Sequence, residues 1–336
     1  MEASKAITPP VPAAQSLRKV GRRLLNMPEL GVSAALILCF VVFAAADKSM
    51  ATPQGLVLLF TQVTYMGFAA IGMCCLMLAG EIDLSTGSVA GLAAAVAATL
   101  IANQGWPEWA GLTAAIVAAV LAGLLNSVVV LKIGVPSFFG TLGTHFVILG
   151  VMQAILRGNW IMVEGKVPFL TQLASPSPFW GVPWTFVILV VLVVVGDFLL
   201  RRSRLGPILS ATGANRRAAD IAGINTTLVK TLCFVLVSVC SAIGGLLVMN
   251  AAITADPQIG DSWQLWVLAI AVIGGSSFSG GLGSISGAFL GALLIQVIKL
   301  GLGAAQIKTN AQGVVVGAIL IVSAILDVLR RRVKKY

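Results

Sequence analysis

Two carboxylates, Glu81 and Asp83, interrupt an apolar part of the chain in the stretch GEIDLSTGS at residues 80–88. A carboxylate inside a lipid bilayer can take up a proton or coordinate a cation, so such groups often drive ion-coupled transport. The same groups can instead cap a helix that begins near Ser85, because the free amides of a helix N-terminus favour negative charge. The spacing favours capping, and a role in lining a gate stays open.

Neutral polar and aromatic side chains in the other apolar runs are a second group of candidates for binding a polar solute. Each could make a hydrogen bond or packing contact with the solute, or could simply join two helices. The sequence does not choose between these roles. The candidates are Gln62, Asn126, Phe138, Thr141, Asn250 and Gln296.

Enzyme chemistry finds little support in the residue pattern. The single histidine, His145, is interpreted as a hydrogen-bonded packing residue in preference to a substrate contact, and no Ser/His/Asp or Cys/His arrangement accompanies it. The five cysteines lie in apolar runs, without the spacing of a metal site or a disulfide framework. A GxxxxGK[ST] phosphate-binding loop does not occur. We therefore predict no catalytic residue, no metal site and no cofactor.

The composition is that of an integral membrane protein. Hydrophobic residues make up 58% of the 336, charged residues make up 10%, and the mean hydropathy is +0.99, far outside the range of soluble domains. We predict an all-α integral membrane protein, because apolar runs near the ~20 residues that cross a bilayer recur along the chain. About ten transmembrane helices are expected, at residues 30–46, 56–79, 86–102, 110–131, 137–156, 182–200, 230–250, 264–276, 282–300 and 311–329. The eighth is short and precedes several glycines, so it could be a broken or half-crossing helix.

Lysine and arginine positions orient these helices. With the N-terminus inside, 17 of the 22 Lys and Arg residues fall on the cytoplasmic side, as the positive-inside rule requires. Both termini are then cytoplasmic. The chain divides into a basic tail at residues 1–29, a transmembrane domain at 30–329 and a second basic tail at 330–336. The net charge of +10 therefore follows membrane sidedness, and no nucleic acid partner is expected.

The helices fall into two sets of similar length, at residues 55–156 and 230–329, that enter the membrane from opposite sides. Such inverted-topology halves are common in transporters. A faint echo accompanies them, between LSTGSVAG at residues 84–91 and GSISGAFLG at residues 283–291. We expect the interruption at residues 80–88 and the glycine-rich stretch at 274–287 to break the two halves at matching places and to line a pathway or its gates.

The connection at residues 201–230 is the one sizeable polar segment between long apolar runs. Its residues 210–224 are rich in alanine and contain Gly213 and Gly223. This pattern predicts a short interfacial helix closed by a glycine, since glycine readily takes the left-handed conformation that ends helices. A solvated loop and a docking surface are both compatible with it.

Four stretches, taken in this order, resemble the permease subunits of bacterial sugar ABC importers, the ribose, xylose, arabinose and galactoside permease family. They are GEIDLSTGS at residues 80–88, VPSFFGTLG at 135–143, ATGANRRAADIAGIN at 211–225 and GGSSFSGGLGSISG at 274–287. The resemblance covers residues 55–329. It implies a multi-pass protein of the bacterial inner membrane that pairs with a second copy of itself. It also implies a cytoplasmic ATPase that holds the ATP, and a periplasmic binding protein that delivers the sugar.

The resemblance further implies that residues 201–230 are the loop that couples the permease to the ATPase. The family pattern G-x-N-x-x-A-A-x-x-x-G-I falls on Gly213, Asn215, Ala218, Ala219, Gly223 and Ile224. A helix with a small face could seat closely in a groove of the ATPase, and basic residues could steer the association. The chain departs from the family at Arg216 and Arg217, where members often carry an acidic residue, and at Glu81, where members commonly carry Gly or Ser.

The function predicted from the sequence is import of a monosaccharide or cyclic polyol (pentose, hexose or inositol-like) by a homodimeric permease that a separate ATPase drives. The alternative is an ion-coupled secondary transporter of a small polar solute, which inverted repeats would equally permit. The scarcity of carboxylates within the membrane argues against that alternative. The gate or pathway candidates are Glu81, Asp83, Ser85, Asn126, Phe138, Thr141 and Asn250.

Overall fold

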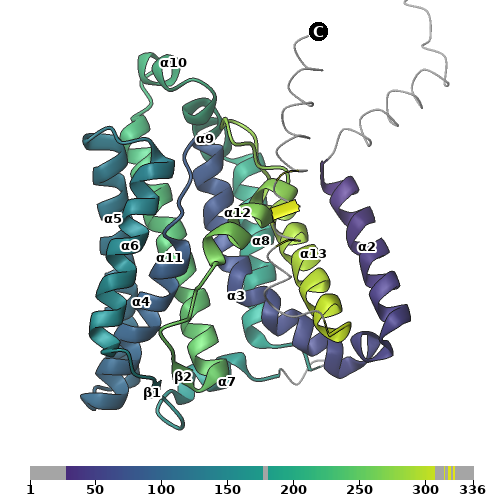
Figure 1. Ribbon diagram of the computed structural model, residues 1–336. Helices are drawn as coiled ribbons and strands as arrows, with labels where there is room; N and C mark the ends of the chain where they lie inside the picture. The colour runs from purple at the N-terminus through teal and green to yellow at the C-terminus, as the bar shows by residue number, and fades with distance from the viewer. Residues whose placement is uncertain (1–27, 177–180, 307–313, 315–316, 319–320, 322–336) are drawn as a thin grey trace, which may run out of the picture.

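Long apolar helices make up most of the computed structural model, which describes residues 28–176, 181–306, 314, 317, 318 and 321. Figure 1 shows the helices side by side, with short connections gathered at two ends. In chain order the elements are α2 (Pro28–Ala46), η1 (Lys48–Ala51), α3 (Pro53–Leu78), α4 (Thr86–Ala98), η2 (Thr99–Asn103), α5 (Glu108–Ser127), η3 (Val128–Lys132), α6 (Ser137–Leu156), β1 (Ile161–Met162), α7 (Pro168–Ala174), α8 (Trp184–Arg202), α9 (Leu205–Ala214), α10 (Arg216–Ile221), α11 (Thr226–Ala252), β2 (Thr254–Ala255), α12 (Trp263–Ile273) and α13 (Ile285–Ala304).

Eight of the described helices are long and apolar enough to cross a membrane. They are α2, α3, α4 with its π-helical extension η2, α5 with η3, α6, α8, α11 and α13. The span expected at residues 264–276 is the eleven-residue helix α12, which rises about 16 Å. By itself it is therefore too short to cross about 30 Å of hydrocarbon, which is compatible with the broken or half-crossing helix that its length and following glycines suggested. The tenth expected span and both basic tails lie almost wholly outside the described residues.

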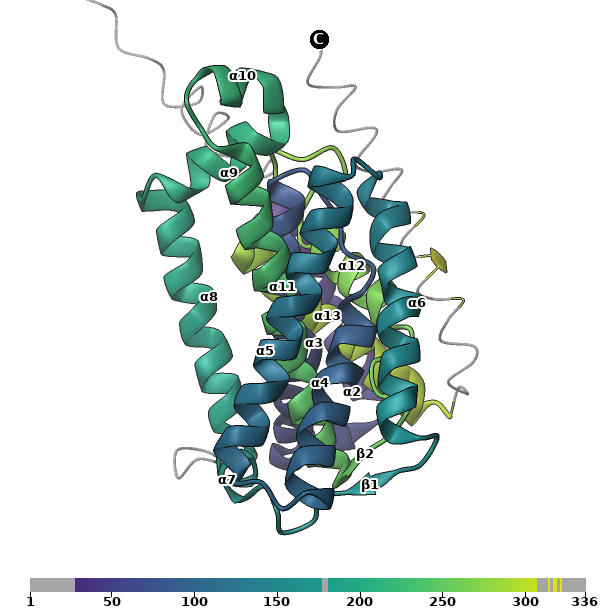
Figure 2. The ribbon, with the colours of Figure 1, turned by 90° about the vertical axis from the view of Figure 1, so that its left-hand side faces the viewer.

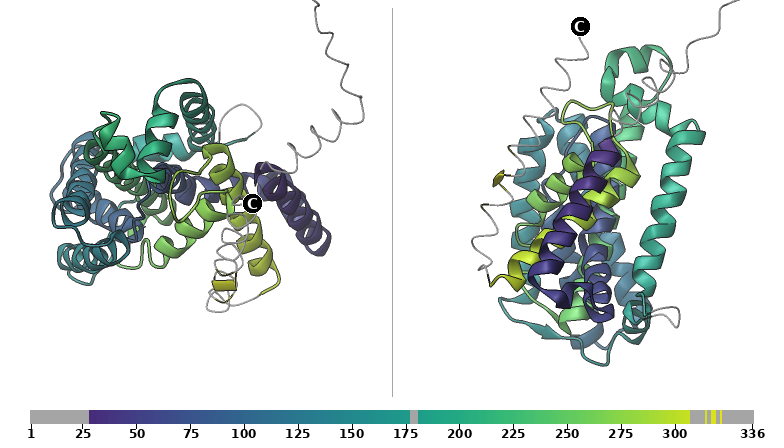
Figure 3. Two further views of the ribbon diagram at one scale, coloured as in Figure 1. Left: turned by 90° about the horizontal axis from the view of Figure 1, so that it is seen from above. Right: turned by 90° about the vertical axis from the view of Figure 1, so that its right-hand side faces the viewer.

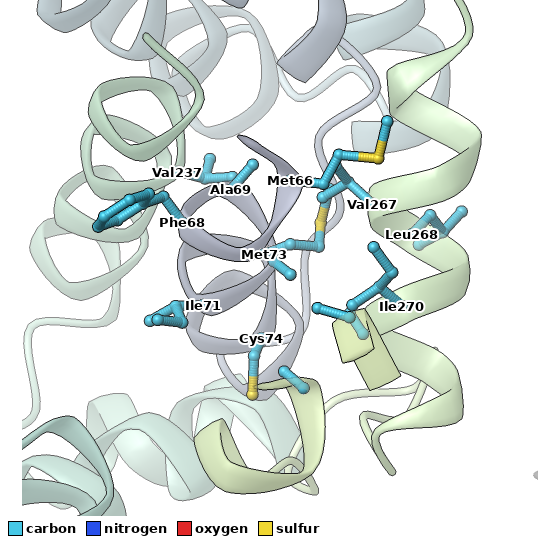
Figure 4. Packing of buried hydrophobic residues seen from close by; sticks show 14 of the residues in the cluster. Met66, Phe68, Ala69, Ile71, Met73, Cys74, Val237, Val267, Leu268 and Ile270 are labelled. Carbon is cyan, nitrogen blue, oxygen red and sulfur yellow. The ribbon is translucent and has the colours of Figure 1, made fainter. Parts of the chain in front are cut away.

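The central helices α3 and α11 pack backbone against backbone. A Cβ added at Gly72 would lie 2.6 Å from the Cα of Val237, and one at Gly244 would lie 2.0 Å from the carbonyl oxygen of Tyr65. Small residues allow this approach, and the dispersion attraction between the closely packed backbones holds the helices together in lipid. On another side of α3, Met66 and Met73 belong to one buried cluster with Val267 and Ile270 of α12 (Figure 4).

Helices at the edge of the bundle expose large apolar side chains. Ile37 and Leu38 of α2 and Val194 and Phe198 of α8 are each more than 60% exposed. Figure 2 shows α8 at the margin of the bundle, and Figure 3 shows α2 at another margin. Such faces fit a lipid environment, where apolar exposure has no cost.

Different connections close the two ends of the bundle (Figure 1). At one end β1 pairs antiparallel with β2, with Ile161 opposite Ala255, and α7 lies nearby. Glu108 of α5 accepts hydrogen bonds there from the first amides of α7, including that of Phe169 at 2.9 Å. The opposite end carries α9 and α10, and we call it the α10 end.

The interfacial segment forms two helices where one was predicted. Asn215 takes an extended conformation, with φ of −156°, and so ends α9. Its side chain then accepts a hydrogen bond from the amide of Ala218 at 3.0 Å and caps α10. Gly223 follows α10 with φ of +84°, a conformation that suits glycine. The single-helix prediction was wrong because an asparagine that caps the next turn also stops the preceding helix.

Candidate substrate pathway and coupling surface

Asp83 is fully buried just before α4 and anchors a polar network. Its Oδ1 accepts hydrogen bonds from the backbone amide and the hydroxyl of Ser85, at 2.7 Å and 2.6 Å. Its Oδ2 accepts a third from Nδ2 of Asn126 on α5, at 3.1 Å. The carboxylate thus binds the amide of Ser85, the residue that precedes α4, and holds the turn that leads into the helix. Among the described residues, no side chain caps the first amides of α4 itself, so the cap that the spacing favoured is not formed there.

Helix α6 completes this network. Asn126 also donates to Oγ of Ser85 at 2.8 Å, and Thr144 donates to Oδ1 of Asn126. The hydroxyl of Thr141 accepts from the backbone amide of Leu84 at 2.9 Å. The interruption before α4 is therefore fixed to both α5 and α6 by buried and satisfied polar groups, an arrangement that specifies one packing geometry.

Glu81 lies two residues from Asp83 but belongs to a separate contact. Its Oε1 is 2.6 Å from Nζ of Lys230 on α11, and the two side chains are 14% and 7% exposed. Lys230 is the last residue of the predicted coupling loop at 201–230, and nothing in that pattern pointed to Glu81 as its partner. The position of Lys230 one turn inside a long apolar helix could have indicated an ion pair, because a lysine there must reach a counter-charge or water.

The remaining pathway candidates lie elsewhere. Asn250, near the far end of α11, accepts a hydrogen bond from Thr171 of α7 at 2.8 Å. Phe138 is 47% exposed near the start of α6 and packs edge-on against Phe139. The structure therefore brings Asp83, Ser85, Asn126 and Thr141 together, and leaves the other three candidates, Glu81, Phe138 and Asn250, apart from them. Among the described residues, no group of three or more His, Cys, Asp or Glu could hold a metal ion.

Helix α10 presents an exposed tip at its end of the bundle (Figure 2). Ala219 is buried beneath it, whereas Ile221 is 82% exposed. The predicted coupling pattern includes Ile224 but not Ile221. The position of Ile221 inside that pattern, three residues before Ile224, was the available signal for it.

Three glycines join α9 to the two interruptions. A Cβ added at Gly213 would lie 2.1 Å from the carbonyl oxygen of Leu78 and 2.7 Å from the amide of Gly281. A Cβ at Gly280 would lie 2.7 Å from both the carbonyl oxygen of Gly213 and the Cα of Gly80. The amide of Gly281 also donates to the carbonyl of Leu78 at 3.0 Å. We call this contact of Gly80, Gly213 and Gly280 the glycine junction.

The two interruptions that meet at this junction do not occupy the same place in the order of helices. Residues 79–85 follow α3, the first helix of the N-terminal set, whereas residues 274–284 follow α12, the second helix of the C-terminal set. The expectation of matching places was wrong in this respect. The stretch that follows the first helix of the C-terminal set is 253–262, between α11 and α12.

A bundle of membrane-crossing helices with buried polar interruptions and a structured loop at one end defines a multi-pass membrane permease. The chain belongs to the permease family described as "branched-chain amino acid transport system / permease component", whose model matches residues 55–324. This membership agrees with the resemblance to importer permeases that the four sequence stretches carry.

Curated relatives align along nearly the whole chain. The ribose import permease protein of Bacillus subtilis is 31% identical over 309 residues, which cover 90% of this chain and 93% of that protein. The galactose/methyl galactoside import permease protein of Escherichia coli is 29% identical over 330 residues, with 93% and 97% covered. The L-arabinose permease of an ABC transporter in Azospirillum brasilense is 27% identical over 305 residues, with 91% and 89% covered.

Proposed function

We propose that this chain is the membrane subunit of an ABC importer that carries a monosaccharide or cyclic polyol into the cytoplasm of a bacterium. Its similarity to permeases named for ribose, galactose and arabinose import supports this substrate class over an amino acid. A periplasmic binding protein delivers the solute, and two copies of the chain form the pathway. The α10 end is the cytoplasmic end in this proposal, and both termini are cytoplasmic.

In this proposal the ATPase binds to α9 and α10. The observation that supports this coupling role is the glycine junction. Helix α9 touches residues 79–85 and 274–284 directly through backbone, so a movement of α9 must displace both interruptions. Close packing transmits such movements because packed interfaces shift between discrete arrangements rather than deform smoothly. Asn215, Ala218, Ala219, Gly223 and Ile224 shape the docking helix, and Gly213 passes its movement to the pathway.

Co-purification and uptake together test the proposal. The chain would be expressed with its neighbouring ATPase and binding protein, purified by a tag on the chain, and reconstituted into proteoliposomes. Labelled ribose, galactose, arabinose, inositol and leucine would be offered with ATP or with an ion gradient alone. We expect the ATPase to co-purify and one of the sugars or inositol to enter only with ATP and binding protein. Uptake of leucine alone, or uptake driven by the gradient, would contradict the proposal.

Replacing Ile221 by glutamate tests the docking surface. The side chain is 82% exposed, so the substitution costs the isolated permease little stability. At a desolvated interface an unpaired charge costs several kcal/mol, and we expect the affinity for the ATPase to fall about 100-fold. Co-purification of the two subunits, and binding of the ATPase to the immobilised permease, would measure this affinity. Leu228→Glu is the matched control, because Leu228 is 53% exposed in the first turn of α11, where a carboxylate is tolerated. Equal ATPase binding by both variants would remove α10 from the interface.

A further inference from the structure

Two helices, α4 and α12, begin inside the bundle and not at its ends. The non-helical residues 79–85 lead from the α10 end to α4, and residues 256–262 lead from β2 at the opposite end to α12 (Figure 1). Polar backbone at membrane depth is tolerated where it is buried in protein or lines a water-filled cavity. The two stretches therefore mark the part of the bundle where water or a solute has to be considered.

The starts of the two helices meet. A Cβ on Gly260 would lie 2.0 Å from the carbonyl oxygen of Gly87, and a Cβ on Gly87 would lie 2.1 Å from that of Gly260. The same Cβ on Gly87 would be 2.9 Å from Oε1 of Gln264, in the first turn of α12. Discontinuous helices whose N-termini converge are a recurrent way to build a solute site in transporters.

Contacts with α6 place this meeting point near the middle of the membrane. Toward the α10 end, Leu84 is bonded to Thr141, and toward the other end a Cβ on Gly91 would be 2.4 Å from Sδ of Met152. The ninth residue of the twenty in α6 is His145, which lies between these two contacts and level with the start of α4. A helix of twenty residues spans about 30 Å, the thickness of the hydrocarbon core.

Three buried polar atoms at this level lack a hydrogen-bond partner within the described part of the chain. They are Oγ1 of Thr86, Nδ1 of His145 and Oε1 of Gln264. Thr86 is fully buried and His145 is 8% exposed. The hydrogen-bonded packing role expected for His145 is thus not found for its Nδ1. Buried polar groups are almost always paired, so three unpaired atoms together indicate a missing water or ligand.

A carboxylate belongs to the same stretch of chain. Asp261 directly follows Gly260, whose backbone packs against Gly87, it is exposed, and it forms no ion pair with any described residue. A charge at mid-membrane depth normally faces the bundle interior or water and not lipid. The exposed side of Asp261 is therefore expected to face water or another polar group and not lipid.

We propose that Thr86, His145, Asp261 and Gln264 form a subsite that binds the hydroxyl groups of the transported solute. Two adjacent hydroxyls would donate to the Asp261 carboxylate, and another would donate to Oε1 of Gln264, which is an acceptor only. The carboxylate repels anions, so the site favours a polyhydroxylated molecule without an acidic group over its sugar-acid counterpart. This inference rests on the proposed function, because it assigns residues to that function's substrate.

The subsite is tested by labelling and by uptake in the reconstituted complex. The labelling rate of Asp261→Cys is compared with that of Val147→Cys. Val147 is 59% exposed and lies two residues after His145 on the same helix. The labelling of the wild-type chain, which has its own cysteines, is subtracted from both. A charged methanethiosulfonate reagent should label Asp261→Cys at least about 10-fold faster, because the thiolate that reacts forms in water and not in lipid. The sugar that the wild-type complex imports should slow this labelling.

Uptake gives the second readout. We expect Asp261→Asn to lower uptake about 10-fold, the loss expected when hydrogen bonds to a charged group are weakened, while ATPase binding stays unchanged. Equal slow labelling of both cysteine variants, or unchanged uptake by Asp261→Asn, would overturn the subsite. If the wild-type complex imports leucine and no sugar or polyol, the proposed function fails by that result alone, and fast labelling would still show an aqueous pathway at Asp261.

Discussion

Gly213→Ala is expected to abolish most of the solute uptake while leaving the ATPase bound. The added Cβ would lie 2.1 Å from the carbonyl oxygen of Leu78 and 2.7 Å from the amide of Gly281. Both neighbours are backbone, so they cannot turn aside as a flexible side chain would, and α9 must move away from both interruptions. Overpacking of this kind costs about 1–3 kcal/mol, which is enough to favour a displaced α9.

Uptake with ATP and binding protein measures this effect, and we expect it to fall more than about 10-fold, the factor that corresponds to 1.4 kcal/mol. The docking tip at Ile221 lies away from the junction, so the ATPase should still co-purify. Gly150→Ala on α6 is the matched control, because nothing lies within 4 Å of a Cβ there. Wild-type uptake by Gly213→Ala would show that the glycine junction does not transmit movement.

Lys230→Met is expected to destabilise the protein strongly. It leaves Glu81, 14% exposed, as an unpaired carboxylate at the point where α11 meets the interruption before α4. Removing one partner of a buried ion pair typically costs about 3–5 kcal/mol. The melting temperature of the purified protein in detergent should fall by roughly 10 °C, since each kcal/mol shifts it by a few degrees in proteins of this size.

The double variant Glu81→Gln/Lys230→Met separates loss of the pair from loss of packing. Neutralising both partners removes the unpaired charge, so we expect most of the lost stability to return. The control Lys132→Met concerns an exposed lysine, and its melting temperature should stay close to that of the wild-type protein. If the single and double variants melt at the same temperature, the unpaired charge on Glu81 is not the cause of the lost stability.

The membrane class and most of the helices followed from the sequence alone. Apolar runs of bilayer length and the sidedness of Lys and Arg are local properties, so they can be read without knowing which helices touch. The short α12 was also anticipated, because glycines follow it directly. The division of the interfacial segment into α9 and α10 was missed, since the choice at Asn215 between continuing one helix and capping the next depends on only about 1 kcal/mol.

The functional groupings were harder to predict. Asp83 and Ser85 are close in sequence, and their contact followed from the spacing, but Lys230 is 149 residues from Glu81. The glycine motifs at residues 80, 213 and 280 were each noticed separately. Nothing local indicated that they touch, because a glycine that permits close packing carries no mark of its partner.

The sequence by itself therefore determined the environment of this protein, the approximate course of its helices and its family. Only the tertiary structure decided which interruptions meet, that α9 touches two of them, and that His145, Asp261 and Gln264 lie level with the start of α4. The physical reason is that hydropathy and capping act over a few neighbouring residues. Contacts between helices in lipid depend instead on shape and on individual hydrogen bonds between residues far apart in the chain.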